Sequence, residues 1–316
     1  MTRMSGGAAI VQSLLSHGVD RIFGLPGVQI YSLFDALYEA RDRIGVIGTR
    51  HEQGAAYMAF GYAASTGQVG TYAVVPGPGV LNTTAALCTA YGSNTPVLCI
   101  TGQVPSAYLG RGQGHLHELP DQLATMRTLT KWAARIDHPA RVPSLVAEAF
   151  RQMNSGRPGP VELEMCWDIM DMEAEVEIAG PGPGEPPVPP DLEQIERAAE
   201  MVAGAKKPMI VVGGGALGAR QEILELAQTL QAPVVSFRRG RGIVSDRHDL
   251  GFTCVAGYHL WPETDLLLGI GSRLEVPYWH WPRRSKDLKL IRIDIDPVEM
   301  VRLKPDVGIV GDSRTV

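Results

Sequence analysis

The chain has 316 residues, of which 45% are hydrophobic and 20% are charged, and its formal net charge is -5. At roughly 150 residues per domain, this length predicts two domains, each able to bury its own core. The composition excludes disorder, collagen and coiled coil as the main state, and the acidic balance argues against a general nucleic-acid binder. There is no apolar run of the roughly 18 residues that a membrane span needs, and the N-terminus lacks an apolar signal stretch. We therefore expect a cytoplasmic protein that binds neither nucleic acid nor membrane.

The first half of the chain alternates short apolar runs with segments of helical periodicity. In chain order, the pattern predicts a helix over 5–17, a strand over 20–23, a helix over 29–40, a strand over 45–49, a helix over 52–65, a strand over 71–75, a helix over 80–91 and a strand over 96–101. Such alternation predicts a parallel sheet covered by helices on both faces. Ligands of these sheets bind beyond the carboxyl ends of the strands, so the loops after Phe23, Thr49, Val75 and Thr101 are the places to search.

The composition changes over residues 171–190, where acidic residues are followed by a run rich in proline and glycine. Because such a stretch forms neither a helix nor a packed sheet, we expect an interdomain linker. Beyond it, the pattern predicts strands over 208–212, 233–237, 265–270 and 288–295 and a helix over 219–231. The expected fold class is α/β, with two three-layer α/β/α domains over 1–170 and 191–316, each built on a mainly parallel sheet.

Glu52 is the most informative single residue. At helical spacing it shares a face with Ala55, Ala56 and Ala59, which should be the buried face. A buried carboxylate needs a partner, which could be a basic group or the amides of the helix N-terminus. A capping or solvated glutamate is the alternative that this helix alone leaves open.

Two glycine turns follow predicted strands. The stretch from Gly77 to Asn82 would let the backbone approach a ligand closely, and the stretch from Thr101 to Gln103 shares this property. Each could equally be a tight turn.

Residues 115–121 contain His115, His117, Glu118 and Asp121. This spacing is not a specific zinc signature, and we assign no metal ligand. An acid–base role for His117 is chemically easier, because the ordinary pKa of histidine, about 6.5, lies near neutral pH. A polar surface loop remains the alternative.

In the second half, Gly213, Gly215 and Gly218 form a G-x-G-x-x-G pattern between a predicted strand and a predicted helix. Phosphate binding at that helix N-terminus is a possible role. The next strand ends in Arg238 and Arg239 where an NAD site has an acidic residue, which disfavours NAD and leaves NADP, an ADP moiety or a vestigial site open.

The four cysteines share no C-x-x-C spacing and lie in or beside apolar segments, so we expect buried thiols rather than a redox or zinc site. They are Cys88, Cys99, Cys166 and Cys254.

Taken together, these segments resemble the thiamine-diphosphate-dependent enzymes of the acetolactate synthase and pyruvate decarboxylase superfamily. The resemblance rests on an ordered set of short motifs that covers essentially the whole chain. In the first half they are Phe23-Gly-Leu-Pro-Gly27, Arg50-His-Glu52, Met58-Ala-Phe-Gly-Tyr-Ala63, Thr66-Gly67, Gly77-Pro-Gly79 with Asn82, Ile100-Thr-Gly-Gln103, Thr130-Lys131 and Ser155-Gly-Arg-Pro-Gly-Pro-Val161. In the second half they are Gly213-Gly-Gly215, Gly240-Arg-Gly242, Gly271-Ser-Arg273, Ile293-Asp-Ile-Asp-Pro297 and Gly311-Asp312.

The resemblance implies that residues 1–170 bind the aminopyrimidine of thiamine diphosphate and that 191–316 form a central Rossmann-like domain. It implies that Glu52 is the catalytic glutamate, whose carboxyl hydrogen-bonds a pyrimidine nitrogen and promotes loss of the thiazolium C2 proton. The substrate would be a 2-keto acid, with the cofactor as electron sink. By the same resemblance, Pro26, Gly27 and Asn82 line the pyrimidine site, and Gln103 is a weaker candidate.

Three departures from the family pattern qualify these expectations. His117 stands where acetolactate synthases have glutamine, so a histidine that donates or accepts a proton near the reacting carbon becomes a hypothesis. Arg157, Gly213 and Gly215 match family contacts to FAD, but other contacts are replaced, which makes FAD or ADP doubtful. The family's diphosphate- and Mg²⁺-binding pattern is not found, so we expect a third domain or a separate chain to supply it.

The resemblance also implies a homo-oligomer, and this chain alone should be inactive. An NADP-linked reductase and a non-catalytic nucleotide-sensing subunit are the alternative functions.

Overall fold

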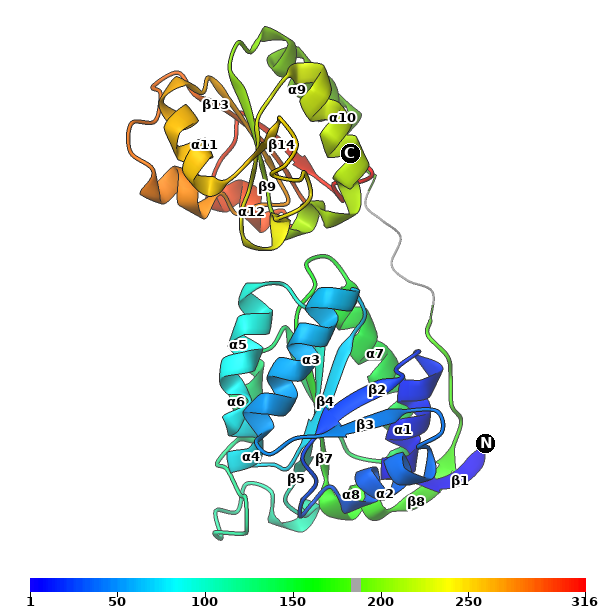
Figure 1. The fold of residues 1–316 in the computed structure, drawn as a ribbon. Coiled ribbons are helices and arrows are strands. Elements are labelled where there is room, and N and C mark those ends of the chain that lie inside the picture. Colours follow the sequence, from blue (N-terminus) through cyan, green and yellow to red (C-terminus); the bar gives the residue numbers. More distant parts are fainter. Residues whose placement is uncertain (183–188) are drawn as a thin grey trace. The chain divides into compact units, whose positions relative to one another are not determined.

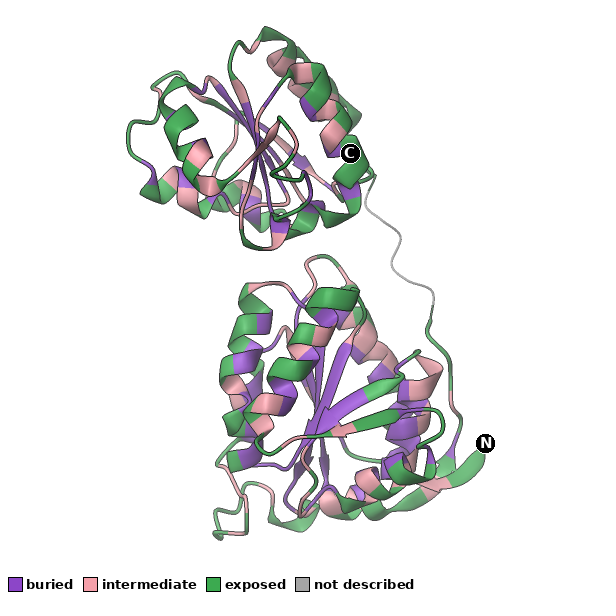
Figure 2. Cartoon of the chain, in the orientation of Figure 1, coloured by how far each residue is buried: buried purple, intermediate pink, exposed green. Residues whose placement is uncertain are grey.

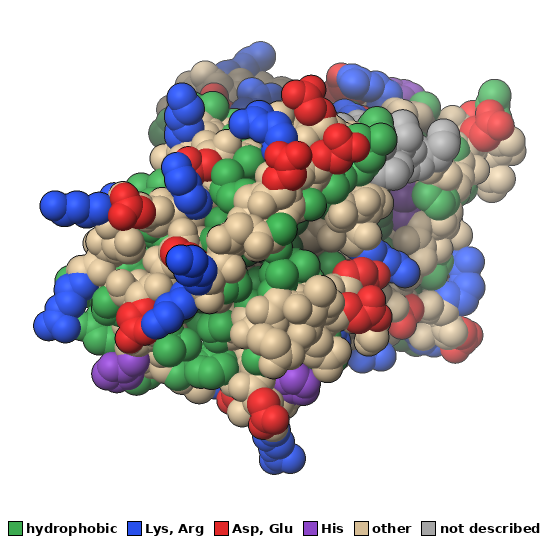
Figure 3. Space-filling model, turned by 90° about the horizontal axis from the view of Figure 1, so that it is seen from above, with side chains coloured by type: hydrophobic (Ala, Val, Ile, Leu, Met, Phe, Trp, Pro, Cys, Tyr) green, Lys and Arg blue, Asp and Glu red, His purple; other side chains and the backbone are tan. Residues whose placement is uncertain are grey.

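The computed structural model describes residues 1–182 and 189–316, which form two compact units, Met1–Glu185 and Pro186–Val316. Each unit is built on a six-stranded parallel sheet flanked by helices (Figure 1), so the predicted fold class is confirmed. No helix in the described residues is long and apolar enough to cross a membrane. On the face drawn in Figure 3, basic and acidic side chains are interspersed, in keeping with 29 Lys and Arg residues against 34 Asp and Glu residues.

The first unit has the strand order β3-β2-β4-β5-β7-β6 in its large sheet. Its elements are β1 (Thr2–Ser5), α1 (Gly6–Ser16), β2 (Arg21–Gly24), α2 (Tyr31–Glu39), β3 (Gly45–Gly48), α3 (Glu52–Thr66), β4 (Gly70–Val74), α4 (Pro78–Asn82), α5 (Thr84–Gly92), β5 (Val97–Gln103), α6 (Gln122–Arg127), β6 (Trp132–Ile136), α7 (Val142–Asn154), β7 (Val161–Cys166), α8 (Trp167–Asp171) and β8 (Glu173–Val176).

Two apolar layers cover this sheet, one on each face. Helices α1, α2 and α7 form one layer, and α3, α5 and α6 form the other. Alternate strand residues serve the two layers: Ile22 packs under the first and Phe23 under the second. The central strands β4, β5 and β7 are buried along their whole length (Figure 2). Burial on both faces explains the mainly apolar sequences of β4 and β5, whereas β7 also contains Glu162 and Glu164.

The second unit has the strand order β11-β10-β9-β12-β13-β14. Its elements are α9 (Leu192–Gly204), β9 (Pro208–Val212), α10 (Arg220–Leu230), β10 (Val234–Ser236), β11 (Gly251–Phe252), α11 (Cys254–Leu260), β12 (Leu266–Ile270), β13 (Lys289–Asp294), α12 (Val298–Arg302) and β14 (Val307–Val310). Side chains of α9 and α10 pack on one face of the sheet, and a cluster around Trp261 and Trp281 packs on the other.

Two predicted elements need correction. The predicted helix over 80–91 is interrupted at Thr83, whose hydroxyl donates to the Val80 carbonyl oxygen at 2.7 Å, so α4 and α5 are separate helices. The predicted linker over 171–190 contains β8, which pairs antiparallel with β1 because its alternating sequence buries Val176. Residues 183–188 of that segment lie outside the described residues.

The cysteine prediction is correct only in part. Cys99 and Cys166 are buried, but Cys88 is exposed on α5 and Cys254 is half-buried. All four thiols are free.

Candidate functional site

Glu52 is the first residue of α3, and residues 49–51 connect it to the carboxyl end of β3. His51 caps this helix, since its Nδ1 accepts a hydrogen bond from the Gln53 amide at 3.1 Å. The Glu52 side chain is half-buried rather than buried as predicted, because it lies where the apolar stripe of α3 ends; Ala55 and Ala59 are fully buried. Its position in the first turn is electrostatically favourable for a carboxylate.

The two Glu52 carboxylate oxygens have different surroundings. Oε2 accepts a hydrogen bond from Asn82 Nδ2 at 2.9 Å. Oε1 receives no hydrogen bond from the residues that the structure describes. The carboxyl is therefore held by one oxygen while the other can bind a ligand, and Asn82, from the end of α4, is the residue that holds it.

Two glycines flank Val75 beside this carboxyl. A methyl group at Gly79 would lie 2.4 Å from Val75 Cγ2 and 3.6 Å from Glu52 Oε1, and one at Gly27 would lie 2.7 Å from Val75 Cγ1. Both contacts with Val75 are far below van der Waals distance, so only glycine fits at these positions. The fold thus brings together Gly27, Asn82 and Glu52, three of the predicted site residues, with the exposed Pro26 next in the chain to Gly27.

His117 lies in the long loop between β5 and α6, and this loop crosses the turn after β4. Gly77 has φ +61°, and a side chain there would come within 2.5 Å of the His117 carbonyl oxygen. The imidazole is hydrogen-bonded through Nδ1 to Gln29 Oε1 at 2.8 Å. Burial lowers the pKa of His117 below its ordinary value, while the nearby Glu52 carboxylate acts in the opposite direction. The two predicted catalytic residues therefore interact electrostatically.

Gln103 and Arg157 are not directed to this site. Gln103 is buried, its Nε2 donates to Glu164 Oε2 at 3.3 Å, and its Oε1 accepts from the Val104 amide at 2.8 Å. Arg157 precedes β7, at the amino edge of the parallel sheet, whereas Glu52 follows the carboxyl edge of β3.

A buried polar network beneath the site was not predicted. Gln122 Oε1 accepts from the Gly77 amide at 2.9 Å, and its Nε2 donates to the Gly102 carbonyl at 3.1 Å and to Glu164 Oε2 at 2.9 Å. Arg135 forms an ion pair with the same glutamate. The signal that could have found it is the pair of glutamates, Glu162 and Glu164, in an otherwise apolar strand.

The polar run over 115–121 organises its own loop. Glu118 accepts hydrogen bonds from the Gly112 and His115 amides at 2.9 Å each, and Asp121 caps α6 by accepting from the Ala124 amide. His115 stacks on Tyr108, with ring centroids 4.9 Å apart. Within residues 1–182 and 189–316, no group of three His, Cys, Asp or Glu side chains could hold a metal ion.

In the second unit, Gly213 and Gly215 of the glycine run pack closely against the backbone of Gly271. A methyl group at Gly213 would lie 2.2 Å from the Gly271 carbonyl oxygen, and one at Gly215 would lie 2.9 Å from Gly271 Cα. The Ser313 hydroxyl donates to the Gly215 carbonyl oxygen at 2.7 Å. These contacts account for the glycines without a nucleotide, so the predicted phosphate site has no support beyond its motif.

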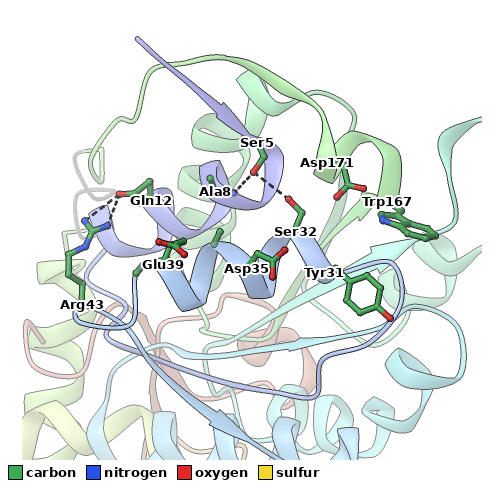
Figure 4. A pocket seen from close by; sticks show the side chains of 12 residues that line it. Ser5, Ala8, Gln12, Tyr31, Ser32, Asp35, Glu39, Arg43, Trp167 and Asp171 are labelled. Carbon is green, nitrogen blue, oxygen red and sulfur yellow. Dashed lines mark hydrogen bonds between the residues drawn. The ribbon is translucent and has the colours of Figure 1, made fainter.

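A separate pocket of about 660 Å³ lies between α1, α2 and α8 (Figure 4). Tyr31, Asp35, Trp167 and Asp171 are among the side chains that line it, and none of the predicted site residues does. It belongs to the α1–α2 layer, on the face of the sheet opposite α3.

Comparison with known proteins agrees with this arrangement. Residues 4–125 match the family model described as "Thiamine pyrophosphate enzyme, N-terminal TPP binding domain", and residues 195–316 match "Thiamine pyrophosphate enzyme, central domain".

Curated relatives align along almost the whole chain. A probable 2-ketoarginine decarboxylase of Pseudomonas aeruginosa is 36% identical over 98% of the chain and 56% of its own length. A probable acetolactate synthase large subunit of Methanocaldococcus jannaschii is 34% identical over 99% and 55%, and an acetolactate synthase of Arthrospira platensis is 36% identical over 99% and 57%. The chain thus spans about half the length of these relatives. With its N-terminal and central domains both matched, the chain belongs to the thiamine pyrophosphate-dependent enzyme family and is acetolactate synthase-like.

Proposed function

We propose that this chain forms the pyrimidine-binding and central parts of a thiamine-diphosphate enzyme that makes or breaks a C–C bond beside the carbonyl of a 2-keto acid. The observation that carries the proposal is the Glu52 carboxyl, held through Oε2 by Asn82 and open at Oε1, beside the glycines that flank Val75. The printed names of the relatives, acetolactate synthases and a 2-ketoarginine decarboxylase, support the substrate class.

The residues present fit a heteroaromatic ring that offers a nitrogen to Glu52 Oε1. Gly27 and Gly79 pack against the two γ-methyl groups of Val75, and because Gly79 has no β-carbon, nothing from this residue stands 3.6 Å from Glu52 Oε1. Thiamine diphosphate, when bound, supplies a thiazolium ring that stabilises negative charge on the substrate carbon. Glu52 would hold the proton shared with a pyrimidine nitrogen at Oε1, and Asn82 would orient the carboxyl by its hydrogen bond to Oε2.

His117 is the second proton-handling group in the proposal. Because burial lowers the pKa of His117, its imidazole is mainly neutral near pH 7 and can accept a proton. Its backbone is packed against Gly77 and its ring is bound by Gln29, so its position is defined. We assign it the proton transfers to and from the substrate-derived group.

We further propose that the diphosphate and Mg²⁺ are held outside residues 1–316, by a further domain or a partner chain, and that the working enzyme is a homo-oligomer. The half-length match to the relatives supports this proposal, since they provide chain beyond the two matched domains.

Hydrogen–deuterium exchange at C2 of added thiamine diphosphate tests the role of Glu52. The measurement uses the full-length enzyme, or this chain with its diphosphate-binding partner, in the presence of Mg²⁺. We expect Glu52→Gln to slow exchange by roughly 10²–10⁴-fold, the usual contribution of a positioned acid–base group. The matched control is Glu193→Gln, because Glu193 also lies in the first turn of its helix, α9, and is exposed in the other unit. Exchange that is equally fast in the Glu52 and Glu193 variants would refute the proposal.

A further inference from the structure

Gln29 is a fully buried polar residue in a strained backbone conformation, between β2 and α2. Its side chain has no solvent-exposed surface, and its φ is +77°, a value that residues other than glycine rarely adopt. A methyl group at Gly102 would lie 2.5 Å from the Gln29 carbonyl oxygen, so the Gln29 backbone is fitted against β5. Such strain persists only where the surrounding structure maintains it, and it is often associated with function.

The Gln29 amide binds two consecutive residues of the loop that carries His117. Its Nε2 donates to the Leu116 carbonyl oxygen at 2.7 Å, and its Oε1 is 2.8 Å from His117 Nδ1. Leu116 as a whole is 56% exposed, and Gln29 binds the loop through the Leu116 backbone carbonyl.

The chemistry of these partners fixes the orientation of the amide. A backbone carbonyl oxygen only accepts hydrogen bonds, so the group facing Leu116 must be the NH₂ of Gln29. A flipped amide would bring two acceptor oxygens to 2.7 Å with no proton between them. Gln29 therefore presents its oxygen to His117 Nδ1, and this oxygen is an acceptor only. The proton must lie on Nδ1.

We propose that Gln29 is a positioning residue that holds neutral His117 as the Nδ1–H tautomer, so that Nε2 is the nitrogen that accepts and returns the proton. The catalytic use of Nε2 rests on the proposed function, whereas the tautomer does not. Without Gln29, the imidazole would exchange between two tautomers, only one of which has its lone pair on Nε2.

Two other histidines of the chain, His51 and His138, should have the opposite tautomer and can serve as references for His117. His51 Nδ1 accepts from the Gln53 amide at 3.1 Å, and His138 Nδ1 accepts from the Ala140 amide at 3.1 Å. In both rings the neutral form must carry its proton on Nε2. One spectrum can therefore compare His117 with two histidines that should show the reverse pattern.

The test is a long-range ¹H–¹⁵N correlation spectrum of the chain labelled with ¹⁵N-histidine, recorded at a pH where the imidazoles are neutral. The His117 signals are assigned by their loss in His117→Gln. We expect a protonated-type shift for His117 Nδ1 and an unprotonated-type shift for Nε2, with the opposite pattern at His51 and His138. A His117 pattern that matches His51 would overturn the proposal, and this wild-type measurement needs no variant at Gln29.

A second arm tests whether Gln29 is the cause. Gln29→Met keeps the side-chain length and removes the acceptor, so the two His117 nitrogen shifts should converge as the tautomers mix, while Gln53→Met, an exposed control, leaves them unchanged. Unchanged His117 shifts in a folded Gln29→Met protein would overturn the proposal. Failure of the proposed function would instead be seen in C2 exchange that does not depend on Glu52, and it would leave the tautomer result intact.

Discussion

Replacement of Gln122 by methionine tests the buried network beneath the site. Gln122 is 1% exposed and makes three hydrogen bonds, to the Gly77 amide, the Gly102 carbonyl and the Glu164 carboxylate. Methionine has a similar length but no hydrogen-bonding amide, so it removes these bonds with little change in volume. The substitution thus isolates the polar contribution of Gln122.

The expected loss of stability follows from the polar groups that would no longer be hydrogen-bonded to the Gln122 amide. Each buried polar group that loses its hydrogen bond costs about 1–3 kcal/mol. Glu164 keeps Gln103 and Arg135 as partners, and the Gly102 carbonyl keeps the Thr101 hydroxyl at 3.3 Å, so the shares of these two groups should be small. The Gly77 amide loses its side-chain acceptor. We therefore expect Gln122→Met to lower the free energy of unfolding of the first unit by about 2–3 kcal/mol, a substantial part of the ~5–15 kcal/mol typical of a domain.

The assay is a urea series in which amide hydrogen exchange of peptides from β4 and β5 is followed by mass spectrometry. These strands report on the first unit alone, whereas fluorescence would mix its tryptophans with those of the second unit. The control is Gln53→Met, an exposed position on α3 that should change stability by less than about 0.5 kcal/mol. A Gln122→Met protein within about 1 kcal/mol of wild type would show that the network does not stabilise these strands.

Two further predictions concern β7 and the packing of β4. Burial raises the pKa of the Glu162 carboxyl well above its ordinary range, and both of its oxygens lack a hydrogen-bond partner among the described residues. The folded state therefore retains a proton that the unfolded state loses above about pH 4.3, so the Glu162 contribution to stability should fall as pH rises towards its folded pKa. Unfolding free energies at pH 5, 7 and 9 should decline less in Glu162→Gln than in wild type, and parallel curves would contradict this. Gly70→Ala should destabilise by at least about 2 kcal/mol, because its methyl group would lie 2.0 Å from the Ala59 carbonyl oxygen, whereas Gly48→Ala, also in a strand but with open space around it, is the matched control in thermal unfolding.

Local sequence patterns determined most of the secondary structure and indicated the loops in which the candidate site lies. Continuous apolar strands alternating with helices predict two parallel sheets, because a strand buried on both faces needs apolar side chains along its whole length. The loops that carry Gly27, Glu52 and Asn82 could be predicted because the carboxyl ends of parallel strands meet at one edge, whereas the choice of these residues came from the family resemblance. Helical periodicity did not predict the break at Thr83, because a single hydrogen bond from its hydroxyl to the Val80 carbonyl oxygen separates α4 from α5.

Tertiary structure alone decided which polar side chains form hydrogen bonds within the protein and which can bind a ligand. Gln103 was a predicted site residue, yet its amide and that of Gln122 both donate to Glu164, because this buried carboxylate needs hydrogen-bond donors. Gln29 and His117 are 88 residues apart in the chain, and only the crossing of two loops brings an acceptor to the imidazole. The physical reason is that hydrogen bonds between distant segments depend on register and loop path, which local periodicity does not encode, whereas burial of apolar strands depends on composition over a few neighbouring residues.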